Sequence, residues 1–267
     1  MTEYPVARAP YGAPRLRQRS GGHLLTATWL IFRRHLRQTL RTKIGVLFGV
    51  LQPMLYLLFF GPLLDELGSG SWQLVVPGLL VQLVLLSAGL AGFGIVFDQR
   101  FGVLDRLRTT PAPRVALLLG RVLRDVVVLL TQAVLIVVVG VALGLRAPVA
   151  GVVLTLVLLV PLAGGVAAGS YAVALRPGAS ELFAPVMTTI VVPLTLLSGA
   201  FLPMSLGPRW LDLLSRLDPF RYAVDALREL FAGRYTSGPV LLGTAMTLAT
   251  AAVAIALGVR AFRTDPA

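Results

Sequence analysis

The sequence predicts an all-α integral membrane protein with six transmembrane helices, and two observations support this fold class. Six stretches are each apolar over about 20 residues, the length of helix that crosses a hydrocarbon core about 30 Å thick. The arginines are distributed unevenly between these stretches, which orients the chain in the membrane. The expected spans are Ile44–Leu64, Leu74–Phe97, Leu123–Leu145, Gly151–Leu175, Leu182–Leu202 and Val240–Phe262.

The composition distinguishes this chain from soluble proteins. Hydrophobic residues make up 56% and charged residues 13% of the sequence, against about 25% charged in an average soluble domain. Runs such as Val126–Leu145 lack the polar face that a soluble helix turns to water. The lack of cysteine excludes disulfides and cysteine-ligated metals. The net charge of +12 comes from basic residues that flank the spans, so membrane topology explains it better than nucleic-acid binding.

The basic residues place both termini in the cytoplasm. Residues 1–43 carry nine Lys or Arg and one acid, whereas the first connection, 65–73, has no basic residue. Because Lys and Arg are enriched in cytoplasmic loops, we predict an N-in, C-in topology. The expected organisation is a disordered basic tail (1–22), an amphipathic interfacial helix (23–43), a six-span transmembrane domain (44–262) and a cytoplasmic tail (263–267).

The segment before the first span has the pattern of an amphipathic helix. Leu25, Phe32 and Leu36 recur near helical spacing, with Arg33 and Arg37 mostly on the other side. Such a helix lies in the membrane interface, where its arginines meet anionic lipid. The alternative is an Arg-rich flank that only sets the topology.

Polar side chains inside the spans are few, and they leave two interpretations open. They form hydrogen bonds between helices, or some of them line a substrate pathway for an amphiphile. Glycine-rich stretches at 89–94 and 164–169 favour close helix packing, with a gating hinge as the alternative. The candidate pathway residues are Gln52, Gln82, Gln132, Ser170, Thr188, Thr195 and Ser198.

The sequence predicts no catalytic residue, metal or cofactor in this chain. Lys43, the single lysine, does not follow a glycine-rich phosphate-binding loop. His23 and His35 lack the spacing of metal ligands. A chain of buried carboxylates or histidines for proton relay is also missing, which disfavours a proton-driven transporter.

The connection between the second and third spans contains a short amphipathic segment that ends at Pro111 and Pro113. Apolar residues recur every three positions and arginines surround them. A helix of this kind lies along the membrane or docks in the groove of a partner. The apolar stripe is Phe101, Leu104 and Leu107, and the arginines are Arg100, Arg106 and Arg108.

Two motifs resemble the permeases of type-2 ABC exporters, most closely the daunorubicin-resistance-like drug exporters. The first motif runs from Arg100-Phe-Gly-Val-Leu-Asp-Arg-Leu-Arg through Pro-Ala-Pro-Arg114. The second comprises Ser198-Gly-Ala-Phe-Leu-Pro203, Pro208-Arg-Trp-Leu211, Asp218-Pro-Phe220 and Asp225-Ala-Leu-Arg228. The resemblance extends from about Thr26 to Arg263. The family often has Asn where this chain has Asp218.

The resemblance implies a dimer of six-span permeases and two copies of a separate ATPase subunit, which holds ATP and Mg. The ATPase engages a cytoplasmic coupling helix, here about Arg100–Thr110, and short helices in Met204–Tyr235 dip into the outer leaflet. The implied coupling residues are Arg100, Phe101, Gly102, Leu104, Arg106, Leu107 and Arg108. The implied outer-leaflet residues are Trp210, Asp218, Pro219, Asp225 and Arg228, of which Asp225 and Arg228 are spaced to pair.

We therefore expect the membrane subunit of an ATP-driven exporter in a bacterial cytoplasmic membrane. It moves a hydrophobic or amphiphilic compound (a drug, antibiotic or lipid) and is not an enzyme by itself. A homodimer is the simplest assembly. The alternatives are a non-ATP secondary transporter or channel, a membrane enzyme acting on lipid, and a structural assembly factor. The enzyme would need a cluster of His, Asp or Glu near one interface. The acids near the interface, Asp98, Asp105 and Asp125, are better explained by their neighbouring arginines.

Overall fold

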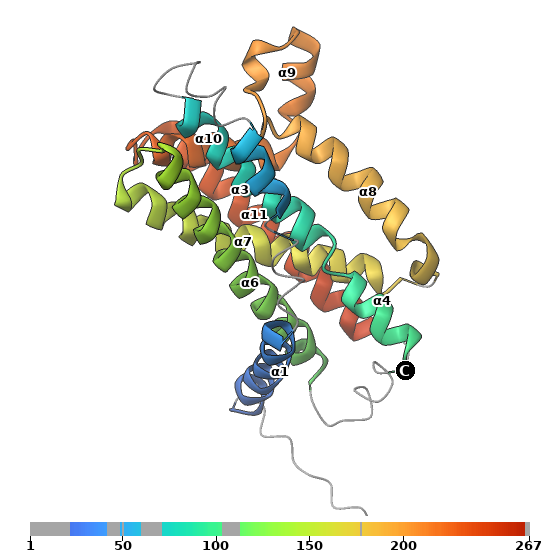
Figure 1. Ribbon diagram of the computed structural model, residues 1–267. Coiled ribbons are helices and arrows are strands. Elements are labelled where there is room, and N and C mark those ends of the chain that lie inside the picture. The colour runs from blue at the N-terminus through green and yellow to red at the C-terminus, as the bar shows by residue number, and fades with distance from the viewer. Residues whose placement is uncertain are drawn as a thin grey trace, which may run out of the picture.

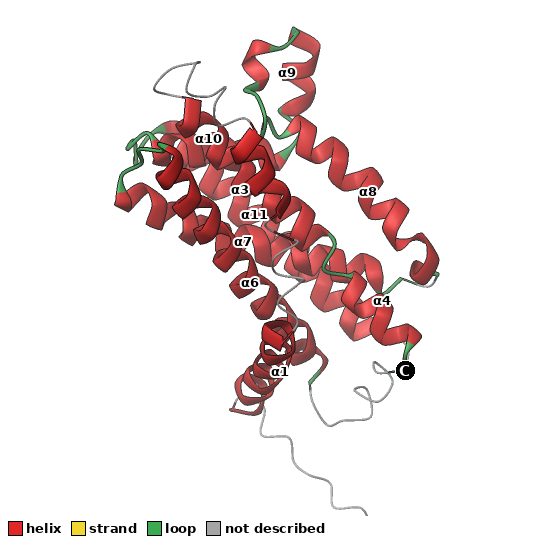
Figure 2. Ribbon diagram, in the orientation of Figure 1, coloured by secondary structure: helices red, strands yellow, loops and turns green. Residues whose placement is uncertain are grey.

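The computed structural model describes residues 22–41, 49, 51–59, 71–102, 113–176 and 178–264. All regular structure within these ranges is helical, which confirms the predicted all-α class (Figure 2). The long helices are α3 (Ser71–Gly89), α6 (Arg114–Leu143), α7 (Val149–Ala174), α8 (Ala179–Leu197) and α11 (Gly238–Thr264). The shorter ones are α1 (Gly22–Arg41), α4 (Phe93–Arg100), the 3-10 helix η1 (Met204–Leu206), α9 (Arg209–Ser215) and α10 (Pro219–Phe231), and residues 51–59 are also helical.

The long helices lie lengthwise in one bundle with two distinct ends (Figure 1). Helix α1 and the end of α11 lie at one end, here called the α1 end. Helices α9 and α10 lie at the other, here called the α9 end (Figure 1). Segments α3–α4, α6, α7, α8 and α11 pass in turn from one end to the other, as successive membrane spans do.

Four helical segments are long and apolar enough to cross a membrane, namely Trp72–Arg100, Arg114–Leu143, Val149–Ala174 and Gly238–Thr264. They correspond to the second, third, fourth and sixth predicted spans. The fifth corresponds to α8, whose stretch Glu181–Leu197 is apolar but shorter. The first, 44–64, is described only at residue 49 and residues 51–59. Large apolar side chains face outward on these helices, as contact with lipid tails requires.

Helix α6 begins at Arg114, well before the predicted start of the third span at Leu123. Pro113 precedes the helix and Ala116 and Leu118 are buried in its first turns, where Gly120 lies against Ile31 of α1. Helix α1 therefore covers this part of α6. A hydropathy window misses this extension because Arg121 and Arg124 lower the local average.

Three helices are joined by close backbone contacts through glycine. A Cβ atom added to Gly165 of α7 would lie 2.6 Å from the Cα of Ala251 in α11. A Cβ atom on Gly243 of α11 would lie 2.5 Å from the Cβ of Ala226 in α10 and closer still to a backbone carbonyl oxygen of α10. Only glycine permits such an approach. Close packing is thus confirmed for the 164–169 stretch.

The other glycine-rich stretch separates two helices. Helix α3 ends at Gly89 and α4 begins at Phe93. The hydroxyl of Ser170 in α7 donates to the Gly89 carbonyl at 2.5 Å and accepts from the Gly92 N–H at 2.9 Å. One side chain therefore satisfies two backbone groups that the break in the helix leaves open.

Candidate functional site

A charged pair anchors α4 at the α1 end. The guanidinium of Arg121 in α6 donates to the carboxylate of Asp98 in the last turns of α4. Arg121 is only 2% exposed, so this partner is required to compensate its burial. Burial, together with the positive charges of Arg121 and Arg124, lowers the pKa of His35 in α1 to about 4. His35 is therefore neutral at physiological pH, and α1, α4 and α6 meet at this cluster.

A second polar group links α6 to α7 nearby. The Tyr171 hydroxyl donates to the carboxylate of Asp125, and the Arg124 guanidinium lies 3.0 Å from the same carboxylate. The interpretation that Asp98 and Asp125 pair with neighbouring arginines is confirmed, whereas Asp105 lies outside the described residues. These two acids are therefore engaged in connecting helices.

The predicted coupling helix, about Arg100–Thr110, overlaps α4 only at Arg100, and Phe101 and Gly102 form a turn instead of continuing the helix. Arg100 is the last residue of α4, and Gly102 follows in a left-handed conformation (φ 64°) that ends the helix. Phe101 is 77% exposed and points away from the core. The other predicted coupling residues, Leu104, Arg106, Leu107 and Arg108, lie outside the described residues.

At the α9 end, Arg228 of α10 joins three elements. Its Nε donates to the Leu74 carbonyl of α3 at 3.0 Å, and its Nη2 donates to the Gly199 carbonyl after α8 at 2.7 Å. The predicted pairing with Asp225 is confirmed, at a long 3.7 Å. Sequence reasoning missed the two carbonyl contacts because a backbone acceptor carries no residue-specific signal.

Asp218 and Pro219 begin helix α10. The Asp218 Oδ1 accepts from the Phe220 N–H at 3.0 Å, and Pro219 occupies the first turn, where the missing N–H costs nothing. The Asp218 Oδ2 is buried without a hydrogen-bond partner among the described residues. Burial raises the pKa of Asp218 to about 6, against the opposing effect of the Phe220 N–H.

Helix α9 has an exposed apolar face, as a helix that dips into a leaflet requires. Trp210 is 66% exposed and Leu217, just after the helix, is 81% exposed. Leu213 and Leu214 are also exposed. The apolar surface predicted for this segment is therefore present at the α9 end.

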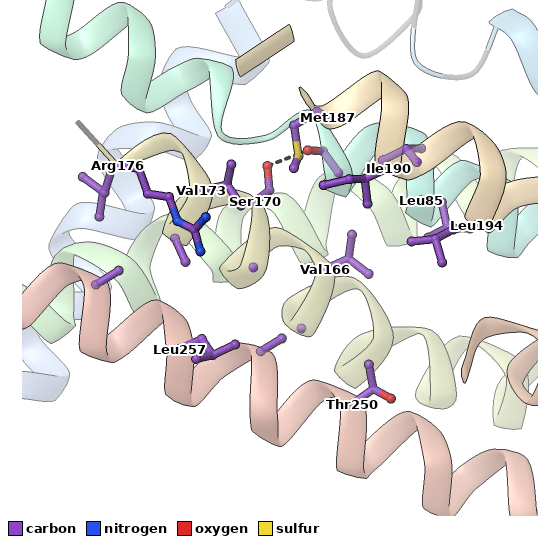
Figure 3. Close-up of a pocket in the computed structure, with 18 of the residues that line it drawn as sticks. Leu85, Val166, Ser170, Val173, Arg176, Met187, Ile190, Leu194, Thr250 and Leu257 are labelled. Carbon is purple, nitrogen blue, oxygen red and sulfur yellow. Dashed lines mark hydrogen bonds between the residues drawn. The ribbon is translucent and has the colours of Figure 1, made fainter. Parts of the chain in front are cut away.

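A cavity of about 920 Å³ lies between α3, α7, α8 and α11 (Figure 3). Of the predicted pathway residues, Ser170 alone lines it. Gln82, Gln132, Thr195 and Ser198 are buried elsewhere in the bundle, and Gln52 and Thr188 are exposed. Thr195 and Ser198 donate to carbonyls of their own helix. The structure thus places the candidate pathway residues at several separate positions.

The walls of the cavity are mainly apolar. Leu85, Met187, Ile190 and Leu194 point toward it from α3 and α8, and α7 and α11 contribute small residues (Figure 3). Its end nearest α1 is lined by the polar residues Gln99, Arg176, Arg260 and Thr264. Neither arginine was singled out from the sequence, because arginines near span ends are explained by topology alone.

Comparison with known proteins identifies the family. A model of the ABC-2 type transporter family matches residues 26–232. The chain is 31% identical over 219 residues to the daunorubicin resistance ABC transporter permease protein DrrB1 of Streptomyces coeruleorubidus, covering 77% of this chain and 74% of that protein. It is 29% identical over 214 residues to the putative transport permease ycf38 of Cyanophora paradoxa, covering 76% and 73%. The chain therefore belongs to the ABC-2 type transporter family, as a multi-pass membrane subunit of an ABC transporter.

Proposed function

We propose that this chain is the membrane-spanning subunit of an ATP-driven exporter in a bacterial cytoplasmic membrane. It has six spans, with the α1 end in the cytoplasm and the α9 end outside. A separate ATPase subunit, present in two copies, binds ATP and Mg, and a second copy of this chain completes the membrane pathway. Each part of this proposal rests on a different observation.

The first span is supported by two contacts, one made by Gly49 and the other by Tyr56 in the helical residues 51–59. Gly49 lies against the side chain of Gln132 in α6, and the Tyr56 ring packs edge-on against Phe201 after α8, with centroids 5.6 Å apart. The chain thus approaches the α9 end before α3 begins there. Reporter fusions at Gly68 and Tyr235 test the topology. Both should report an outside location, and a cytoplasmic signal from either would contradict six spans.

Coupling to the ATPase rests on the pair between Asp98 and Arg121, the observation that most supports the proposed function. Helix α4 ends at Arg100, the first residue of the segment proposed for coupling, and is tied through this pair to α6, beside His35 of α1. An ATPase that moves the segment after α4 therefore pulls on α6 and α1 as well. Coupling of this kind is a free energy that links a distant nucleotide site to the membrane pathway.

Copurification tests the proposed partner. The chain is expressed with the ABC ATPase encoded by a neighbouring gene, and the complex is isolated through a tag on the ATPase. Changing Leu104 and Leu107 to Asp should abolish copurification, because the substitutions place charges in the apolar stripe. Leu217→Asp is the matched control, since Leu217 is exposed at the opposite end of the bundle. Equal recovery of all variants would contradict the docking role.

The cargo proposed is an apolar or amphiphilic compound that leaves the cell. Two findings support this class, the apolar walls of the cavity and the similarity to a permease named for daunorubicin resistance. Loss of the chain should raise the cellular content of its cargo. A lower content in the deletion strain would indicate import.

A further inference from the structure

The cavity between α3, α7, α8 and α11 is polarised along its length. At the α1 end lie two guanidinium groups, Arg176 after α7 and Arg260 in the last turns of α11, with Gln99 and Thr264 beside them. No acid lines the cavity, and neither arginine forms an ion pair within the part of the chain that the structure describes. Arginine stays charged at any physiological pH. One end of the cavity is therefore permanently positive.

The rest of the cavity accepts an apolar body. It extends along α11 from Arg260 to Thr250, a length of about 15 Å at 1.5 Å per residue. Figure 3 shows the Arg176 side chain extending from the end of α7 toward α11, with Leu257 below it and the α8 side chains opposite. The volume of about 920 Å³ is that of a site for a drug-sized ligand.

We propose that this cavity binds a single-chain or compact amphiphile that has an anionic group at one end. The anion, a carboxylate, sulfonate or phosphate, contacts Arg176 and Arg260, and its apolar body lies against Val166, Ile190 and Leu194. Two arginines disfavour a cationic head at this end, and a neutral head gains no ion pair there. That this ligand is the cargo rests on the proposed function, whereas binding itself does not.

Photo-crosslinking in nanodiscs tests the site. The probe is a 12-carbon fatty acid with a diazirine near its methyl end, compared with the matching alcohol, in a zwitterionic phosphatidylcholine bilayer. The acid should label α7 and α8 near Val166 and Ile190, with at least about tenfold higher affinity than the alcohol, because charge-assisted hydrogen bonds are the stronger ones. Changing Arg176 and Arg260 together to Gln should remove this preference and leave the alcohol unchanged.

The control is Arg263→Gln, since Arg263 lies on the same end of α11 and does not line the cavity. Equal labelling by the acid and the alcohol would overturn the proposal. So would an equal loss of the preference for the acid in Arg263→Gln, or crosslinks from α8 to a second copy of the chain instead of the probe.

A second experiment distinguishes two identities of the natural ligand, by adding ATP to the complex of the chain with its ATPase. Release of the probe identifies transported cargo, and retention identifies a resident anionic lipid, both of which support the site. The labelling experiment uses the chain without the ATPase, so a lack of preference for the acid would overturn this site and leave the proposed exporter function intact.

Discussion

The two sides of the bundle are held together in different ways. Helices α7, α10 and α11 touch through backbone at Gly151, Gly165 and Gly243. Helix α8 itself packs on α3 and α4 through side chains, such as Phe183 on Phe93 with ring centroids 4.9 Å apart, and the cavity lies between it and α11. The turn after α8 meets the α3 backbone at Gly78. Backbone contacts permit little relative movement, whereas side-chain contacts can rearrange. The comparison predicts that α7, α10 and α11 form a rigid unit and that α8 is held less tightly.

The largest expected effect breaks the rigid side. Gly243→Ala should lower the stability by about 3 kcal/mol, because the new methyl group meets the backbone of α10 and has no room to shift. Gly169→Ala is the matched control, since its Cβ would lie an ordinary 3.8 Å from that of Ala254. Thermal unfolding of both purified variants checks this expectation. Equal unfolding midpoints would mean that the α10–α11 contact is not rigid.

The next largest effect concerns the link from α4, on the α8 side, to α6. Asp98→Ala leaves the Arg121 charge buried without its partner and should cost about 3 kcal/mol. Changing Arg121 to Met in the same chain should restore most of this stability, because the uncompensated charge is gone. In the proposed complex the double variant should fold and bind the ATPase but respond poorly to it. A double variant with normal transport would show that the charged pair does not transmit movement.

The sequence is sufficient for features that depend on averages over many residues. Periodic apolar residues predicted the helical class, four of the spans and the exposed face of α9, and residue spacing predicted the pairing of Asp225 with Arg228. The sequence did not predict single contacts between segments that are distant along the chain. Arg121 looked like one more topology-setting arginine, and its burial is evident only once Asp98 and α1 are placed around it.

The cavity illustrates the same limit at the candidate site. It is lined by small residues of α7, such as Gly165 and Gly169, which pack toward α11, and by larger apolar residues of α8. The polar residues proposed for a pathway were chosen by residue type, and Ser170 alone reaches the cavity. Its charged end is lined by Arg176 and Arg260, which are far apart in the sequence and which the fold brings to the same cavity.

A third prediction tests the connection between the rigid unit and the turn after α8. Arg228→Gln should lower stability by about 2 kcal/mol, because the carbonyls of Leu74 and Gly199 lose charge-assisted hydrogen bonds. Arg234→Gln is the matched control. Arg234 pairs with Glu229 at 2.6 Å but is exposed, so its loss should lower the stability much less than the loss of Arg228 does. Similar losses in chemical denaturation of the two variants would contradict a special role for Arg228.

An effect of similar size depends on pH and concerns the start of α10, within the rigid unit. The folded protein raises the pKa of Asp218 to about 6, above its ordinary value near 4, because the carboxylate is buried. The folded state thus holds this proton more tightly than the unfolded state does. The resulting stabilisation is complete below about pH 4 and is lost as the pH rises through about 6. Asp218→Asn keeps the helix cap and has no charge to bury, so above about pH 6 it should be more stable than the wild type by about 2 kcal/mol.

Asp212 supplies a control of opposite sign. Hydrogen bonds from Arg221 and Arg216 lower the pKa of Asp212, so its ionised form contributes stability at neutral pH that is lost on acidification. Asp212→Asn should therefore be less stable than the wild type at neutral pH and converge with it in acid. Unfolding midpoints measured from about pH 3 to about pH 7.5 separate the two variants, because Asp212 titrates below about pH 4 and Asp218 near pH 6. If the unfolding midpoints of Asp218→Asn and the wild type changed in parallel with pH, the Asp218 carboxylate would be more open to water than its burial indicates. The first turn of α10 would then not belong to the rigid unit.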